Sequence, residues 1–366
     1  MGDIKLKKGT GILFVMAVLF ISSLIYLHYG DQNTLRVGIF YGSNWEVPGT
    51  VHYEILDQAI KKFESKYPNV KVEYEKGILS NDYSEWLSEQ ILKGTEPDVY
   101  LVLDEDFNTL ASLGALKNLD MLVGGDKEFD FNVFYSSVYK AGQYEGSQYA
   151  LPMECNPTLM FVNKTLLQKE GIKVPDNDWT WDDFYDICKT IVKDSDGDGQ
   201  MDQFGCYDYT WIQAVYSNGI TPFNQSGTSS NFLDEKFSQS LEFVKRLEAT
   251  NRNYQVTSND FDLGKVAFRP FTFSDYRTYM PYPWRIKKYS GFEWTCIRMP
   301  AGPSGDNRSE MSALMAGMSS RTEKKQCAWD FVKLLTTDTD IQKLVYEDTS
   351  AASVLKSVNT SQDTMN

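Results

Sequence analysis

The chain has 366 residues, which predicts about two to three domains, and 36 Lys and Arg against 50 Asp and Glu give a formal net charge of −14. A surface this acidic repels phosphate backbones, so nucleic acid is excluded as a partner. Apolar residues at 42% and aromatic residues at 14% indicate a folded protein, and only two histidines are present, which excludes multi-histidine zinc sites.

Residues 1–30 are typical of an export segment. Three lysines, Lys5, Lys7 and Lys8, precede an apolar run from Gly11 to Leu27 that contains no charged residue. As a helix, this run is marginal for a hydrocarbon core of about 30 Å, so it is either a signal peptide or an uncleaved signal anchor. The absence of a clear small-x-small cleavage site before Asp31, and of a lipobox cysteine, favours the anchor over the cleaved form. A buried core helix is the remaining alternative.

Strands and helices alternate in the next part of the chain. Strands are predicted at 35–40, 70–74 and 97–103, with helices at 53–67 and 86–92 between them. This order predicts a mostly parallel α/β sheet. Ligands of such sheets bind beyond the carboxyl ends of the strands, which makes the loops at 43–45 and 104–106 candidate walls of a site.

The rest of the chain is richer in helices. Amphipathic helices are predicted at 179–192, 233–249 and 328–335, and no internal repeat or low-complexity linker separates them from the first part. We therefore expect a second lobe and a chain that crosses between the lobes more than once. The five cysteines form no CxxC pair, so they are expected to pack as small apolar residues rather than as a disulfide framework.

One acidic loop resembles the first part of a calcium-binding loop. Carboxylates occupy its first, third, fifth and ninth positions, and Gly199, at the sixth, permits a sharp turn. The twelfth position is Gly205 instead of the usual glutamate, so a weak, structural calcium site and a solvated acidic loop both remain open. The candidate ligands are Asp194, Asp196, Asp198, Gln200 and Asp202.

Motifs for catalysis are missing, whereas aromatic residues are abundant outside the periodic helices and strands. The sequence contains no GxSxG, GxxxxGK[ST], GxGxxG or HExxH. Aromatic rings in loops offer apolar faces to sugar rings, while nearby carboxylates and amides accept the protons of sugar hydroxyls. For any single ring, ordinary packing is the alternative interpretation.

Ordered blocks from about Leu35 to Lys356 carry a family resemblance. They include AIKKFESKYPNVKVEYE, EPDVYLVLDEDFNTLASLGALKNLD, YALPMECNPTLMFVNKTLLQKEGI, WTWDDF, DSDGDGQMDQFG, RMPAGPSG and SALMAGMSSRTEKKQCAWDFVKLLTTD. In their order and spacing these blocks resemble the extracellular solute-binding proteins of ABC importers, in the sugar-binding, maltose-binding-protein-like class. The resemblance implies an α/β, two-lobed periplasmic-binding-protein-like (type II) fold with a cleft between the lobes.

The resemblance also implies a division of the chain and a site. The first lobe is expected at 34–150 with 294–318, and the second, helix-richer lobe at 151–293 with 319–366, shortened at its C-terminus relative to the family. The expected cleft residues are Asn44, Trp45, Glu105, Asp106, Glu154, Asn156, Tyr209, Trp211, Phe273 and Tyr276.

The function implied is non-enzymatic. An exported protein on the extracellular face of the cytoplasmic membrane, anchored or secreted, would capture a carbohydrate, in particular an oligosaccharide, and deliver it to the membrane subunits of an ABC permease. No cofactor is required, apart from the calcium considered above. Two alternatives remain: a membrane-anchored sugar-sensing domain that acts with a receptor, and a secreted glycoside hydrolase that uses Glu105 or Glu154.

Overall fold

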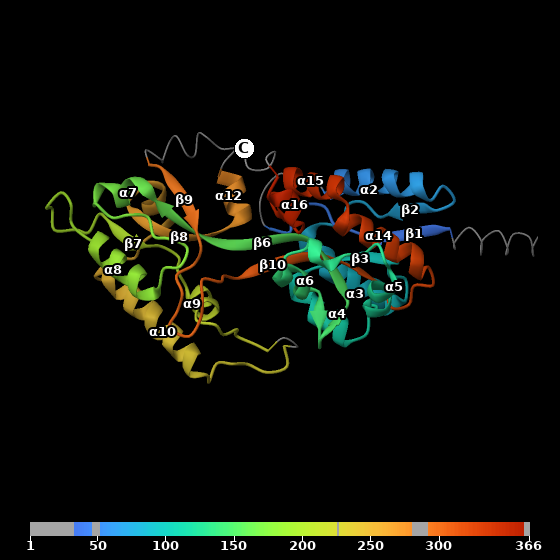
Figure 1. Ribbon diagram of the computed structural model, residues 1–366, viewed down its shortest axis with the longest axis horizontal. Coiled ribbons are helices and arrows are strands. Elements are labelled where there is room, and N and C mark those ends of the chain that lie inside the picture. The colour runs from blue at the N-terminus through green and yellow to red at the C-terminus, as the bar shows by residue number, and fades with distance from the viewer. Residues whose placement is uncertain (1–32, 46–51, 225–226, 280–291, 362–366) are drawn as a thin grey trace, which may run out of the picture.

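The computed structural model describes residues 33–45, 52–224, 227–279 and 292–361, which form two lobes joined by a long strand (Figure 1). The export segment predicted at residues 1–30 lies outside these ranges. Within them, no helix combines the length and the apolar character needed to cross a membrane.

The first lobe is a sheet with helices on both faces. Its strands lie in the order β2-β1-β3-β10-β6, and all four residues of β3 are buried because helices cover the sheet on either side (Figure 1). Helices α2, α14 and α15 lie on one face, and α3, α4 and α6 on the other. The elements are β1 (Thr34–Gly38), α2 (His52–Lys66), β2 (Lys71–Tyr74), α3 (Tyr83–Lys93), β3 (Val99–Val102), α4 (Asp104–Ser112), α5 (Asp120–Gly125), α6 (Ser136–Ala141), β10 (Met311–Met318), α14 (Lys325–Thr337), α15 (Thr339–Asp348), β11 (Ala352–Ser353) and α16 (Lys356–Asn359), with a small hairpin of β4 (Gln143–Tyr144) and β5 (Ser147–Gln148).

The second lobe continues the same sheet through β6 (Ala150–Asn163), β8 and β7, with β9 also paired to β6. Its helices begin at recognisable caps: Thr180 forms a capping box with Asp183 at the start of α8, and Thr210 does so with Gln213 at the start of α9. The elements are α7 (Lys164–Lys169), α8 (Trp181–Ile191), β7 (Phe204–Cys206), α9 (Trp211–Ser217), α10 (Glu235–Glu248), α11 (Ser258–Asp262), β8 (Val266–Thr272), α12 (Phe273–Tyr279) and β9 (Trp294–Ile297).

The long strand β6 belongs to both lobes. Its first half, up to Pro157, pairs with β10, whereas its second half, from Thr158, pairs with β8 and β9. The chain therefore crosses from the first lobe to the second within β6 and returns before β10. This agrees with the expectation of more than one crossing.

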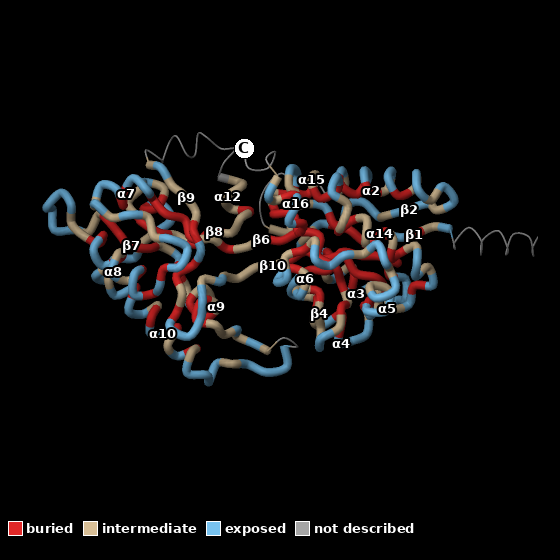
Figure 2. The backbone as a smooth tube through the Cα atoms, in the orientation of Figure 1, coloured by how far each residue is buried: buried red, intermediate tan, exposed pale blue. Residues whose placement is uncertain are grey.

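Each lobe has its own core around its part of the sheet (Figure 2). In the first lobe, Trp329 and Phe331 of α14 pack with Tyr100 of β3 in one large apolar cluster. In the second, Phe184 and Phe268 lie at the centre of another. All five cysteines are unpaired, and Cys155, Cys188 and Cys206 are buried, as expected for cysteines that pack as apolar residues.

The sheet is mixed rather than mostly parallel. The pairings β1 with β2, β1 with β3 and β7 with β8 are parallel, as the alternating elements predicted. However, β10 runs antiparallel to β3 and to β6, and β6 runs antiparallel to β8 and β9. The reason is the path of the chain, because the strand that returns from the second lobe enters the first sheet in the opposite direction.

Two segments belong to a different lobe from the one to which the sequence analysis assigned them. The C-terminal helices α14 and α15 belong to the first lobe, where Trp329, Val332 and Ile341 join its core, although residues 319–366 were assigned to the second. Conversely, β9 pairs with the second-lobe half of β6, although residues 294–318 were assigned to the first. Helical periodicity identifies the apolar face of a helix but not the sheet that this face covers. The assignment of these helices to a lobe therefore rested on the family resemblance alone.

Candidate functional site

Several predicted site residues lie where β1 and β3 end and on the crossing strand β6. The indole Nε1 of Trp45, in the turn after β1, donates a hydrogen bond to Oε2 of Glu154 at 2.8 Å. Glu154 is fully buried on β6, and the backbone N–H of Trp45 also donates to Oγ of Ser43. The half-buried Asn44 lies in the same turn. A buried carboxylate therefore fixes the position of a half-buried indole ring at the edge of the first lobe.

Helix α4 begins with three consecutive carboxylates, where the helix dipole favours negative charge. Asp106 is half-buried and accepts a hydrogen bond from the hydroxyl of Ser84 on α3, while Glu105 is exposed. Asp104 accepts hydrogen bonds from the backbone of Ala313 and the side chain of Ser312, both on β10. The first turn of α4 is thus tied to two neighbouring elements, while Asp104 and Glu105 both remain exposed.

Asp104 is exposed as a residue, although neighbouring protein atoms reduce the hydration of its carboxyl group. Its pKa is raised to about 6, chiefly by the loss of hydration and then by the charge of the adjacent Glu105, with Glu310 adding a smaller effect. Burial likewise raises the pKa of Glu310. These carboxylates take part in no ion pair between residues that the structure describes, so they gather negative charge at the end of the first-lobe sheet.

The second lobe faces this acidic group through α9. Burial raises the pKa of the half-buried Tyr216, and the charges of Glu310 and Asp104 raise it further. Tyr216 belongs to the second lobe and Asp104 to the first, and Figure 1 shows α9 on the side of the second lobe that faces α4. The arrangement combines hydrogen-bond acceptors with two aromatic side chains, Trp45 and Tyr216, at the boundary between the lobes. It supplies the contacts that a neutral, hydroxyl-rich ligand needs.

Two of the predicted site residues make their contacts within the protein and leave no side chain available to a ligand. Tyr209 is 5% exposed and lies in the second-lobe core, with its ring 5.0 Å from that of Phe184. Its hydroxyl accepts a hydrogen bond from Nε1 of Trp181. Asn156 uses its Nδ2 to donate to Oγ of Ser274 and its Oδ1 to accept the Ser274 N–H, both at 2.9 Å. Tyr209 is therefore a core residue, and Asn156 fastens α12 to β6.

The other predicted aromatic residues lie around the site instead of within the acidic group. Phe273 packs beside Tyr346 of α15, and Tyr276 packs edge-on against Trp294 of β9, so α12 contacts both lobes. Trp211 is 38% exposed at the start of α9, where it contacts Phe237. Of these three, only Trp211 is exposed, whereas Phe273 and Tyr276 are half-buried.

Sequence reasoning missed three residues of this group. Asp104 directly follows the apolar run of β3, so the rule that sites lie beyond carboxyl strand ends pointed to its loop, yet only its two neighbours were chosen. Tyr216 gave no comparable signal, because it lies inside a helix of apolar and polar uncharged residues. Glu310 precedes β10, and its proximity to Asp104 depends on the antiparallel return of that strand.

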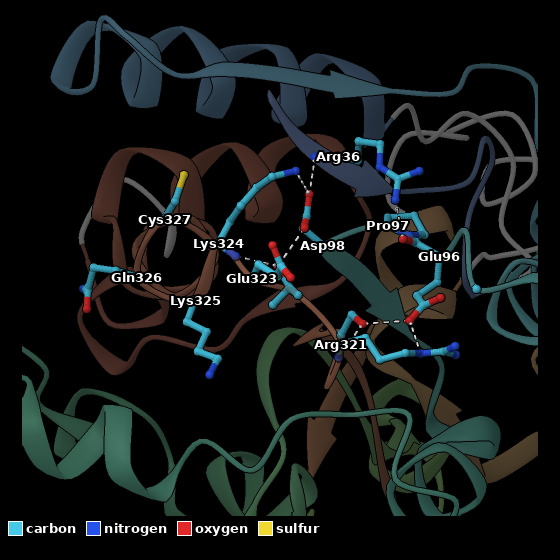
Figure 3. Close-up of a pocket in the computed structure, with 13 residues that line it drawn as sticks. Arg36, Glu96, Pro97, Asp98, Arg321, Glu323, Lys324, Lys325, Gln326 and Cys327 are labelled. Atoms are coloured by element: carbon cyan, nitrogen blue, oxygen red, sulfur yellow. Dashed lines mark hydrogen bonds and ion pairs between the residues drawn. The ribbon is translucent and has the colours of Figure 1, made fainter. Parts of the chain in front are cut away.

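A cavity of about 650 Å³ lies away from this group, at the amino ends of β1 and β3 (Figure 3). There Asp98 accepts hydrogen bonds from the backbone N–H of Arg36, the hydroxyl of Thr322 and Nζ of Lys324. Glu96 accepts from Nε of Arg321 in the same way. Because these contacts join the strand edge to the start of α14, this network stabilises the fold of the first lobe.

The acidic loop of the second lobe brings together part of the predicted calcium ligands. Carboxylate oxygens of Asp194, Asp196 and Asp202 lie within 4.8 Å of one another. Asp198 is outside this group and instead accepts the backbone N–H of Gln200. The pKa of Asp194 is held below its ordinary value by hydrogen bonds from backbone N–H groups, of which that of Gly199 has the largest effect. These backbone contacts therefore favour the ionised form of Asp194.

Two α/β lobes, joined by crossing strands and carrying polar and aromatic residues where they meet, define a two-lobed ligand-binding protein. The sequence pattern of the bacterial extracellular solute-binding proteins matches residues 48–341, and the chain belongs to this family. Its members are binding proteins, so the protein is a binding protein and not an enzyme, as the sequence predicted.

The sequence identity between this chain and individual relatives is low. A multiple sugar-binding protein of Streptococcus mutans is 28% identical over 138 residues, which span 37% of this chain and only 30% of that relative. The sugar-binding protein MalE from Xanthomonas citri has a TM-score of 0.72 at 16% identity, and an ABC substrate-binding protein from Listeria monocytogenes, solved with cycloalternan, has 0.61 at 22%. Each likeness covers 91% of this chain and 82% of the other, and it establishes the two-lobed fold.

Proposed function

We propose that the protein binds a carbohydrate, in particular an oligosaccharide, between its lobes and delivers it to an ABC-type membrane permease. This proposal rests on the indole of Trp45, which the buried Glu154 holds in place, and on the carboxylate of Asp104, whose charge acts on Tyr216 of the second lobe. The indole offers an apolar face to a sugar ring, and the carboxylate accepts sugar hydroxyls. The names of the relatives, a multiple sugar-binding protein and MalE among them, support the same class of ligand.

Closure of the lobes is the mechanism we propose. Residues of the first lobe and Tyr216 of the second would contact the same ligand, so the ligand favours the conformation in which both contacts are made. The strand β6 and the segment that returns to the start of β10 cross between the lobes and would serve as the hinge. The permease would then recognise the closed form.

We place the protein outside the cell, at the cytoplasmic membrane. Lys5, Lys7 and Lys8, followed by the apolar run, support export and retention by an uncleaved anchor. A sensing role beside a membrane receptor would use the same site and differ only in its partner.

A thermal-shift screen of the full chain tests the ligand class. The chain would be kept in a detergent without a sugar headgroup, since a glycoside detergent would itself compete for the site. We expect mono- and oligosaccharides of one series to raise the melting temperature by a few degrees, because a ligand that binds only the native state stabilises it. A cooperative melt that no saccharide moves would contradict the proposal.

We also propose that the loop around Asp194, Asp196 and Asp202 binds Ca²⁺ weakly and in a structural role. Carboxylate groups this close repel one another, and a hard divalent cation would relieve the repulsion. We expect millimolar calcium, but not EDTA, to raise the melting temperature by a few degrees, and Asp194→Asn to abolish the effect. The matched variant Asp198→Asn, outside the trio, should retain it. Equal melting temperatures with calcium and with EDTA would reject the site.

A further inference from the structure

An arm of the second lobe, formed by residues 221–224 and 227–233, extends from the segment between α9 and α10. Phe223 pairs with Ser230 in an antiparallel bridge. The side-chain oxygen Oδ1 of Asn224 accepts hydrogen bonds from the backbone N–H groups of Thr228 and Ser229, at 2.9 and 3.2 Å. Hydrogen bonds therefore hold the two described sides of the arm, 221–224 and 227–233, against each other.

The arm reaches the first lobe (Figure 1). A Cβ placed on Gly227 would lie 3.6 Å from Nδ2 of Asn108, which belongs to α4. This is the helix whose first turn carries Asp104 and Glu105. The arm and the crossing strand β6 lie on opposite sides of the region between α9 and α4 (Figure 1).

Aromatic rings line the arm and its base. Phe223 is 50% exposed and Phe232 is 45% exposed, and their ring centroids are 5.4 Å apart. Phe232 in turn contacts the buried Phe237 at 5.0 Å, and Phe237 contacts Trp211 at 5.7 Å. Single exposed apolar residues are common on protein surfaces, but two accessible rings in contact, Phe223 and Phe232, with Trp211 beyond the buried Phe237, mark a surface that binds something.

The chemistry of the arm indicates what that partner is. Residues 209–233 contain no Asp, Glu, Lys or Arg, although 23% of the whole chain is charged. Beside the rings and the exposed Leu233, the polar side chains of the described arm carry hydroxyl and amide groups, such as those of Thr228 and Asn231. This combination suits a neutral ligand with many hydroxyl groups and gives no charge complementarity to a charged protein surface.

We propose that the arm binds the outer sugar units of an oligosaccharide whose inner units lie beside Trp45 and Asp104, and that it thereby selects for chain length. The proposal rests on the carbohydrate-binding function proposed above. The contact with α4 makes the arm continuous with that site, so one ligand long enough to extend from the acidic group would meet Phe223 and Phe232. A disaccharide held beside Trp45 would not.

The test uses the full chain and the double variant Phe223→Ala/Phe232→Ala. Affinities would be measured by calorimetry for malto- and manno-oligosaccharides of two to six units. We expect the variant to bind the longest sugars of the preferred series about tenfold more weakly and the disaccharide within about twofold of the unaltered protein, since each ring contributes a modest stacking free energy. The control is Phe131→Ala, which removes a 52% exposed ring from the first lobe, outside this row, and should change neither affinity.

The outcomes separate the two proposals. If the unaltered protein binds disaccharides and longer sugars, and the double variant binds all of them equally well, the arm has no role and the proposed function stands. An equal loss at every length would also overturn length selection. If the unaltered protein binds no saccharide of any length, the proposed function fails, and the role of the arm fails with it.

Discussion

Replacing Trp45 by alanine is expected to weaken carbohydrate binding at least tenfold while the protein still unfolds cooperatively. The ring is half-buried at the edge of the first lobe, so its loss removes an apolar face without opening the centre of the core. Stacking and buried apolar area together account for a loss of this size. Calorimetric titration with the best sugar from the thermal-shift screen, alongside a thermal melt of each variant, measures both quantities.

Glu154 provides the internal control for this result. Because it is fully buried and accepts the indole N–H, we expect it to position Trp45 and not to touch the sugar. Glu154→Gln keeps an oxygen acceptor and should lower affinity only a few fold. Added to Trp45→Ala, it should cause no further loss, because the two residues act as a unit. Wild-type affinity in Trp45→Ala would remove Trp45 from the site, and additive losses would show that Glu154 acts independently.

The first part of the fold follows from local patterns. The apolar face of α2 and the uninterrupted apolar run of β3 predicted these elements within a few residues, because burial on a helix face or within a covered strand constrains the sequence directly. The rule that sites lie beyond carboxyl strand ends likewise pointed to the turn of Trp45 and to the start of α4.

The parts that sequence reasoning missed depend on contacts between distant segments. Tyr209 and Trp211 lie two residues apart in an uncharged segment, yet one is a core residue and the other is accessible. The difference arises from the packing of Phe184 and Phe243 around Tyr209, which no local pattern reveals. Similarly, Glu310 approaches Asp104 only because β10 returns antiparallel beside β3.

Carbohydrate binding is expected to weaken about tenfold as the pH falls from 7 to 5. The pKa of Asp104 is raised to about 6 by lost hydration and by the charges of Glu105 and Glu310, so this carboxyl group gains a proton within that range. The protonated form is a poorer acceptor for sugar hydroxyls, and one proton that must leave before binding lowers the affinity by about one power of ten at one pH unit below the pKa. Calorimetry at half-unit pH steps would trace the profile.

Asp104→Asn should separate this binding effect from stability. The raised pKa means that the native state holds the proton more tightly than the unfolded chain, so the contribution of Asp104 to stability falls as the pH rises from about 4 through 6. At pH 7 the ionised carboxylate therefore opposes folding, and the asparagine variant should melt at a higher temperature than the unaltered protein there, with the difference fading towards pH 4. The same variant should bind sugar more weakly at pH 7 and lose most of the pH dependence of affinity. A steep profile that persists in the variant would assign the titration to Glu310 instead, and a lower melting temperature at pH 7 would contradict the unfavourable environment of Asp104.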